Sequence, residues 1–313
     1  MSEPTAAEPQ RIVSMLASGT ELVCALGLGE RLVGRSHECD FPEWVRQLPQ
    51  VSEPTFAIDG SSAEIDRAVR AKLGAGEPLY RVDEAKLLEL APDVLITQTH
   101  CEVCAVSPAD LVHRLPATLS RKPLVALSGS TLSAVREGFV AVAEVLGRRE
   151  AGLALVRRLE QQLEEVRALV SGLARPRVAC IEWTDPPFAM GNWGPELVAI
   201  AGGDNLLGEA GLHSTTISFD AVVTSDPDVL VVAPCGFGLP RAEQEMAALL
   251  SRPEVRELRA VRSGRVYVCD GNLYFNRSSP SLFESPRILA EVLHPEAVAP
   301  SYEGKAWKRY LSR

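Results

Sequence analysis

The sequence predicts an α/β fold of two lobes, each built on a parallel sheet and joined by one long α-helix. Three observations lead to this prediction. Short apolar runs alternate with helical patterns, similar segments occur once in each half, and an extended helical pattern separates the halves. At roughly 150 residues per domain, the 313 residues are enough for two domains that each bury a core.

The apolar runs have the length and the β-branched content of strands. They lie at residues 11–16, 31–36, 93–98, 123–128, 177–183, 228–233 and 265–269. Helical patterns lie between them, for example at residues 61–73, 83–90, 108–115, 240–250 and 280–293. Strands that alternate with helices pair in parallel and carry helices on both faces. We therefore expect a Rossmann-like sheet in each lobe.

An internal repeat supports two related lobes. The segment Glu21–Gly27 resembles Glu196–Gly202, and Pro92–Ile96 resembles Pro227–Val231. Both pairs occur in the same order, and each set follows a β-branched run. Buried parallel strands share apolar patterns by composition alone, but the matching order favours two α/β lobes over coincidence.

A helical pattern connects the lobes. Between Arg148 and Leu173, apolar residues recur every three or four positions, which is typical of an amphipathic helix. Such a helix is roughly 40 Å long, enough to cross from one lobe to the other. We expect an N-terminal lobe at residues 1–129, a helical connector at residues 130–175 and a C-terminal lobe at residues 176–313.

The composition excludes several classes of protein. With 41 acidic and 32 basic residues, the net charge of −9 disfavours nucleic-acid binding through a basic face. No apolar stretch is long enough to predict a membrane span. Residues 1–10 are acidic and unlike a secretory signal, so we expect a cytoplasmic protein, or a periplasmic one if a signal peptide is missing from this chain. In the cytoplasm the seven cysteines are expected to be thiols.

The short motifs of common enzyme classes are absent. The sequence has no phosphate-binding Gly-x-x-x-x-Gly-Lys-Ser/Thr loop, no Gly-x-Ser-x-Gly and no His-Glu-x-x-His. The pair Gly27 and Gly29 follows a helical pattern and lacks a third glycine, so it is not a dinucleotide-binding loop. The absence of these motifs favours a protein that is not an enzyme.

Histidines and cysteines follow two of the predicted strands. His37 and Cys39 follow one strand, and His100, Cys101 and Cys104 follow another. Loops at the carboxyl ends of parallel strands form the ligand crevice, so both groups are expected at the same edge of the first lobe. Either these cysteines and histidines are ordinary loop residues, or they form a zinc or iron site.

Several segments resemble one protein family, and the resemblance runs from about Arg11 to His294. The segments are Val33–Pro42, Glu182–Phe188 followed by Gly191–Trp193, the helical segment Glu196–Asn205, and Val266–Asn272 with Phe275–Arg277. Their order and spacing are similar to those of class III substrate-binding proteins of ABC importers, and of the cobalamin-binding members in particular. The resemblance implies a corrinoid held between two lobes that close little, and an ABC permease or a corrinoid-using protein as partner.

The residues expected to contact this ligand lie in loops at strand ends. Flat aromatic rings there suit a planar macrocycle, and small or polar residues fix its orientation. The candidates are Ser18, Thr20, His37, Phe41, Gln98, Trp183, Trp193, His213, Cys235, Tyr274 and Phe275. The resemblance also supplies a cobalt ion that His37, His100 or a thiolate would ligate.

We thus expect a corrinoid-binding protein that acts as a carrier, a store or a sensor, or as a component of uptake. Two alternatives remain. The first is a protein that binds zinc, iron or another metal chelate, such as a haem or a siderophore, through His37, Cys39, His100, Cys101 and Cys104. The second is a thiol-dependent enzyme that acts on a tetrapyrrole.

Overall fold

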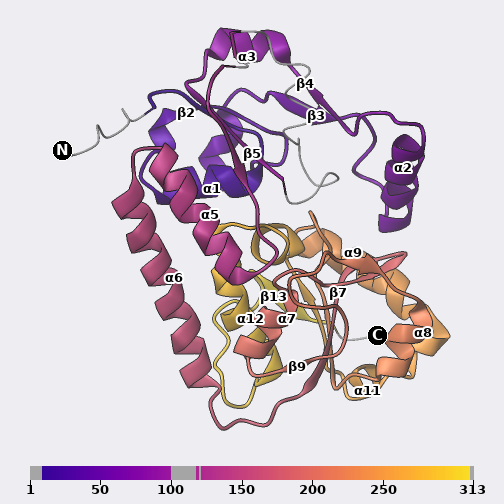
Figure 1. Ribbon diagram of the computed structural model, residues 1–313. Coiled ribbons are helices and arrows are strands. Elements are labelled where there is room, and N and C mark those ends of the chain that lie inside the picture. The colour runs from indigo at the N-terminus through magenta and orange to yellow at the C-terminus, as the bar shows by residue number, and fades with distance from the viewer. Residues whose placement is uncertain (1–8, 100–117, 120, 311–313) are drawn as a thin grey trace.

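The structure is a computed structural model that describes residues 9–99, 118–119 and 121–310. Within these ranges each half of the chain forms a main sheet, and the two halves lie one above the other (Figure 1). The seven runs predicted as strands are all strands. The prediction of two α/β lobes is confirmed.

The main sheet of the first half is parallel, in the order β2-β1-β5-β6. Its strands are β1 (Ile12–Ser14), β2 (Leu32–Arg35), β5 (Val94–Gln98) and β6 (Leu124–Leu127). A separate antiparallel pair, which the sequence did not predict, joins β3 (Ser52–Pro54) to β4 (Tyr80–Val82). The helices of this half are α1 (Ala17–Ala25), α2 (Ser62–Gly74) and α3 (Glu84–Leu90). The helix predicted at residues 108–115 lies outside the described residues.

The sheet of the second half has a parallel centre and antiparallel edges. The parallel strands are β7 (Arg177–Thr184), β9 (Asp204–Asn205), β11 (Val229–Val232) and β12 (Val266–Cys269). The antiparallel strands are β8 (Pro187–Ala189), β10 (Thr215–Thr216) and β13 (Trp307–Arg309). A wholly parallel sheet was expected. For β8 the difference arises because a tight turn after Thr184 returns the chain at once, and so short a connection permits only an antiparallel pair.

Helices cover the second sheet. They are α7 (Gly194–Ile200), α8 (Phe219–Ser225), α9 (Leu239–Leu250), α10 (Pro253–Arg256), α11 (Arg259–Arg262) and α12 (Ser285–Leu293). The helix predicted at residues 280–293 begins with a separate 3-10 turn, η4 (Pro280–Glu284). A π-helical turn, η3 (Gly271–Phe275), follows β12 directly. No helix in the described ranges is both long and apolar enough to cross a membrane.

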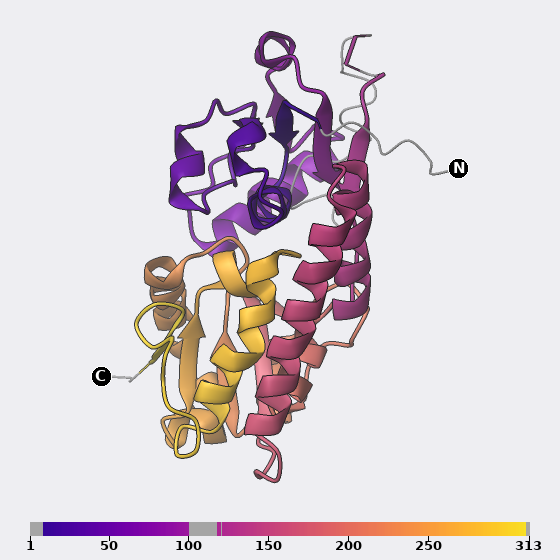
Figure 2. The ribbon, with the colours of Figure 1, turned by 90° about the vertical axis from the view of Figure 1, so that its left-hand side faces the viewer.

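The connector is a pair of helices, α5 (Leu132–Val145) and α6 (Arg149–Leu169). Helix α6 is the predicted long helix, but it ends four residues before Leu173, so it is nearer 30 Å than 40 Å. Figure 2 shows α6 running beside both lobes. Its buried face is the apolar stripe Leu155, Leu159, Leu163 and Val166. The exact lobe boundaries at residues 129 and 175 stay a prediction.

The repeated segments hold equivalent places in the two lobes. The carboxylate of Asp93 accepts the backbone N–H of Arg11 at 3.1 Å, and that of Asp228 accepts the N–H of Arg177 at 2.9 Å. Each aspartate thereby ties the start of one central strand to the neighbouring strand. The two repeats therefore serve the same structural role.

A second link between the lobes lies on α2. A capping box of Ser61 and Glu64 fixes the start of this helix. At its first residue, the backbone N–H and hydroxyl of Ser62 donate to the carboxylate of Glu245 on α9, at 3.2 and 2.5 Å. The hydroxyl of Thr184 on β7 donates to the same carboxylate. Helix α2 of the first lobe is thus attached to the second lobe.

Candidate functional site

A cavity lies between the lobes, and its empty space is about 860 Å³ including the open mouth. Most of its lining comes from segments at the carboxyl ends of the parallel strands, and the rest follows β8 or precedes β10. The lining residues are Leu16, Ala17, Ser18, Glu38 and Gln98 from the first lobe, and Glu182, Gly191, Asn192, Trp193, His213, Cys235, Gly236, Asn272, Asn276, Arg277 and Ser278 from the second. Ligands bind at this edge in open α/β sheets, so the cavity is the candidate site.

Five of the predicted contact residues line this cavity. They are Ser18, Gln98, Trp193, His213 and Cys235. Trp193 is held in place because its indole N–H donates to the backbone carbonyl of Phe275 at 2.8 Å. Cys235 is fixed through its backbone N–H, which donates to the carbonyl of Glu182 at 2.9 Å. The loop with Trp193 follows β8, and the loop with Cys235 follows β11.

Thr20 and Phe275 are turned into the protein, which corrects their predicted role. Both are fully buried and absent from the cavity lining. The hydroxyl of Thr20 faces the sulfur of Cys39 at 2.9 Å, because it lies on the inner face of α1. Phe275 belongs to the core, and only its backbone carbonyl reaches toward the site, through Trp193.

Three other aromatic candidates also lie away from the cavity. The ring of Trp183 packs on Phe237, with 5.2 Å between centroids. The ring of Tyr274 meets that of Tyr302 at 6.0 Å, and burial raises the pKa of Tyr274 to about 12. Phe41 is 43% exposed and outside the lining. Each was placed correctly at a strand end, but its side chain turns to a neighbour or to solvent.

His37 and Cys39 contact different neighbours. The Nδ1 atom of His37 lies 3.2 Å from the hydroxyl of Ser52, and its ring centroid lies 5.0 Å from that of Tyr80. The sulfur of Cys39 lies instead against Thr20, in the buried interior. Burial raises the pKa of Cys39 and favours the neutral thiol, which is a poor metal ligand. Neither residue lines the cavity.

The other three predicted metal ligands, His100, Cys101 and Cys104, lie outside the described residues. Among the residues that the structure does describe, no group of three or more His, Cys, Asp or Glu side chains could hold a metal ion. The zinc or iron site on these loops therefore stays a prediction.

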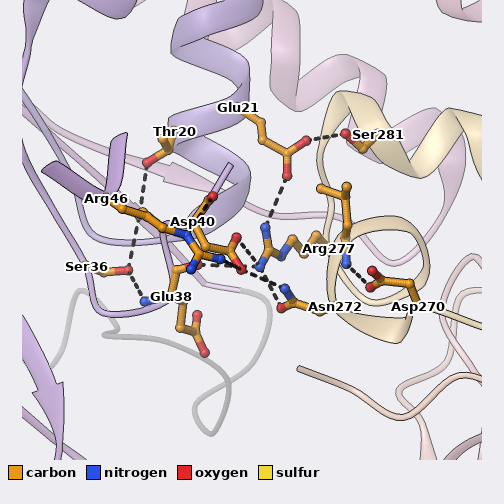
Figure 3. A network of polar contacts seen from close by, with 12 residues as sticks. Thr20, Glu21, Ser36, Glu38, Asp40, Arg46, Asp270, Asn272, Arg277 and Ser281 are labelled. Atoms are coloured by element: carbon orange, nitrogen blue, oxygen red, sulfur yellow. Dashed lines mark hydrogen bonds and ion pairs between the residues drawn. The ribbon is translucent and has the colours of Figure 1, made fainter. Parts of the chain in front are cut away.

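A buried charge cluster, which was not predicted from the sequence, lies beside the cavity (Figure 3). Arg277 lies in the loop after η3. Its Nη2 atom is 2.7 Å from Oδ1 of Asp40, and the same nitrogen donates to Oδ1 of Asn272 at 2.6 Å. Its Nη1 atom lies 3.5 Å from Oε1 of Glu21 on α1. Glu21 also accepts the hydroxyl hydrogen of Ser281 at 2.5 Å. The cluster joins the two lobes.

Burial and pairing act in opposite directions on this cluster. Burial alone would lower the pKa of Arg277, but Asp40 and Glu21 outweigh it and raise that pKa. Burial raises the pKa of Glu21, and the guanidinium of Arg277 and the hydroxyl of Ser281 counteract part of this rise. Arg277 is therefore a charged group whose guanidinium is already paired inside the protein. The sequence signal for it was its place in the loop after the last predicted strand.

Comparisons with known proteins agree with this architecture. A family model described as "Periplasmic binding protein" matches residues 12–273. The chain is 23% identical to a vitamin B12-binding protein of Vibrio vulnificus over 278 residues. This alignment covers 88% of this chain and 86% of that protein. The chain is also 22% identical to YvrC of Bacillus subtilis, an uncharacterised ABC transporter substrate-binding lipoprotein, over 301 residues. That alignment covers 92% of this chain and 81% of YvrC.

The fold is also that of solved structures. The periplasmic vitamin B12 binding protein BtuF of Vibrio cholerae superposes with a TM-score of 0.67 and 19% identity, over 92% of this chain and 98% of that one. A periplasmic heme binding protein from Pseudomonas aeruginosa superposes with a TM-score of 0.68 and 25% identity, over 92% of this chain and 94% of that one.

Proposed function

The chain belongs to the periplasmic binding protein family, and from this premise we propose that it binds a corrinoid in the cavity between its lobes. Members of this family are solute-binding proteins and not enzymes, so the expectation of a binding protein is confirmed. The membership also implies an ABC permease as partner.

The composition of the cavity wall is the observation that carries the proposal. Leu16, Ala17 and Trp193 give it apolar surface, whereas carboxamide groups such as those of Gln98 and Asn192 give it polar groups. A ligand with broad apolar faces and a polar rim matches such a wall, and a corrinoid has both. The vitamin B12-binding relatives support the same class of ligand.

Haem is the second candidate ligand. His213 and Cys235 both line the cavity from the second lobe, and imidazole and thiolate groups are axial ligands of haem iron in proteins. The likeness to the heme binding protein from Pseudomonas aeruginosa supports this alternative.

Equilibrium dialysis against aquocobalamin, haem and a ferric siderophore, each at the same concentration, tests the proposal. We expect one equivalent of aquocobalamin to be retained in preference to the other two. Preferential retention of haem would contradict the corrinoid proposal and support the second candidate.

The cellular location decides which protein receives the ligand. The cytoplasmic location expected from the N-terminal sequence stays a prediction, and fractionation of the source cells tests it. Recovery with the cytoplasmic fraction points to a corrinoid-using protein as recipient. Recovery from the periplasm points to the permease.

A further inference from the structure

Asn192 occupies a constrained position on the cavity wall. Its backbone has a φ of 50°, in the left-handed region that asparagine enters more easily than most residues. Its backbone N–H donates to the carbonyl of Leu212 at 2.6 Å, and its own carbonyl accepts the N–H of Gly211 at 2.9 Å. Two backbone hydrogen bonds therefore hold Asn192 against a neighbouring loop.

The side chain of Asn192 brings an acceptor to the cavity. It is only 8% exposed and lines the cavity, and its Nδ2 group donates to the hydroxyl of Ser214 at 3.5 Å. Its Oδ1 atom is buried and has no hydrogen-bond partner among the described residues. A buried acceptor without a partner is unfavourable, so a ligand that donates an N–H to it removes that penalty.

Asn276 presents the same kind of group. Its Nδ2 atom donates to the backbone carbonyls of Ala233 and Gly271, both at 2.9 Å. The group that it can offer a ligand is therefore its carbonyl oxygen. Asn272 differs, because its amide is already paired with Asp40 and Arg277.

The charged residues at the cavity also favour a ligand that donates N–H groups over one that carries carboxylates. Glu38 and Glu182 line it with carboxylates, and Arg277 is the one cationic lining residue in the described part of the chain. The guanidinium of Arg277 is occupied by Asp40 and Glu21. A ligand carboxylate would therefore meet like charges and acceptors, whereas a ligand carboxamide would find acceptors for its N–H groups.

We propose that Asn192 is a specificity-determining residue that selects ligands whose rim carries N–H donors over ligands whose rim carries carboxylates. This inference rests on the proposed function and deepens it. Among tetrapyrrole-like ligands, it favours a corrinoid with carboxamide side chains over one with free carboxylates, and for the same reason it disfavours haem, which carries two propionates.

Competition binding of two corrinoids tests this inference. Cobinamide carries carboxamides, and cobyrinic acid carries carboxylates on the same ring. At pH 7 we expect the wild type to prefer cobinamide by at least about tenfold. In Asn192→Gly, which keeps the left-handed backbone, this preference falls about fivefold, whereas Asn192→Asp, which keeps the acceptor, retains it.

Asn205 offers a matched control. Its Oδ1 atom is also buried without a partner among the described residues, but it does not line the cavity. We expect Asn205→Gly to leave the preference unchanged. Equal binding of both corrinoids to the wild type, or an unchanged preference in Asn192→Gly, overturns the inference alone. Failure of the wild type to bind either corrinoid overturns the proposed function and this inference with it.

Discussion

Arg277 of the second lobe and Glu21 of the first form an ion pair across the boundary between the lobes, with 3.5 Å between Nη1 and Oε1. Their side chains are only 8% and 3% exposed. Two opposite charges that are removed from water stabilise each other, and each becomes costly when its partner is removed. This pair therefore couples the packing of the two lobes at the edge of the cavity.

Loss of the guanidinium should destabilise the protein strongly. We expect Arg277→Met to lower the free energy of unfolding by about 3 kcal/mol, because Glu21 and Asp40 then lose their buried counter-charge. Urea unfolding measures the change. Arg46→Met is the matched control, since Arg46 pairs with the same Asp40 at 3.7 Å but is 62% exposed, and we expect a change below about 1 kcal/mol. Equal effects of the two variants would contradict a buried role for Arg277.

Acid should destabilise the protein through His37. Burial, aided by the nearby charge of Arg35, lowers the pKa of His37 from 6.5 to about 4. Between these two values the unfolded chain binds a proton at this histidine that the folded chain does not, so the contribution of His37 to stability falls as the pH falls from 6.5 to 4 and is constant below that range. The carboxylate of Glu38, 3.9 Å away, limits the effect, which we expect to be about 2 kcal/mol.

Urea unfolding at several pH values measures this dependence. We expect His37→Gln to remove most of the slope between pH 6.5 and 4. A slope as steep as that of the wild type would assign the acid sensitivity to other groups.

Helix α2 should detach when its carboxylate partner is neutralised. Glu245 accepts hydrogen bonds from Ser62 and from Thr184, and bonds to a charged acceptor contribute about 2 kcal/mol each. We therefore expect Glu245→Gln to speed amide hydrogen exchange over residues 62–74 by about tenfold or more. Hydrogen exchange read out by mass spectrometry measures the change.

Glu243 is the control for this variant. It lies on the same helix, but it pairs with Lys308 at the surface. Glu243→Gln should leave exchange over residues 62–74 as in the wild type. If both variants speed exchange alike, the attachment of α2 does not depend on Glu245.

The fold was predictable from the sequence because its signals are local. A run such as Val229–Val232 is apolar throughout, as expected for a strand buried on both faces, and it lies within the predicted range. The helix at Arg149–Leu169 was visible from its apolar spacing. The strand Pro187–Ala189 was not predicted, because a three-residue strand carries almost no periodic signal.

The site was less predictable because its contacts are not local. Glu21 and Arg277 are 256 positions apart in the sequence, and no spacing rule relates them. Strand ends were predicted correctly, but the direction of a side chain in a loop depends on its tertiary neighbours. Trp193 therefore lines the cavity, whereas Trp183 packs on Phe237.

A visible-absorbance titration of the reduced protein with aquocobalamin tests whether a corrinoid binds in the cavity between the lobes. The titration is run on the wild type and on Cys235→Trp, because the larger ring would fill the cavity that Cys235 lines. We expect saturation at one equivalent for the wild type and loss of binding in the variant. No saturable binding to the wild type, or equal binding to both proteins, would contradict corrinoid binding in this cavity.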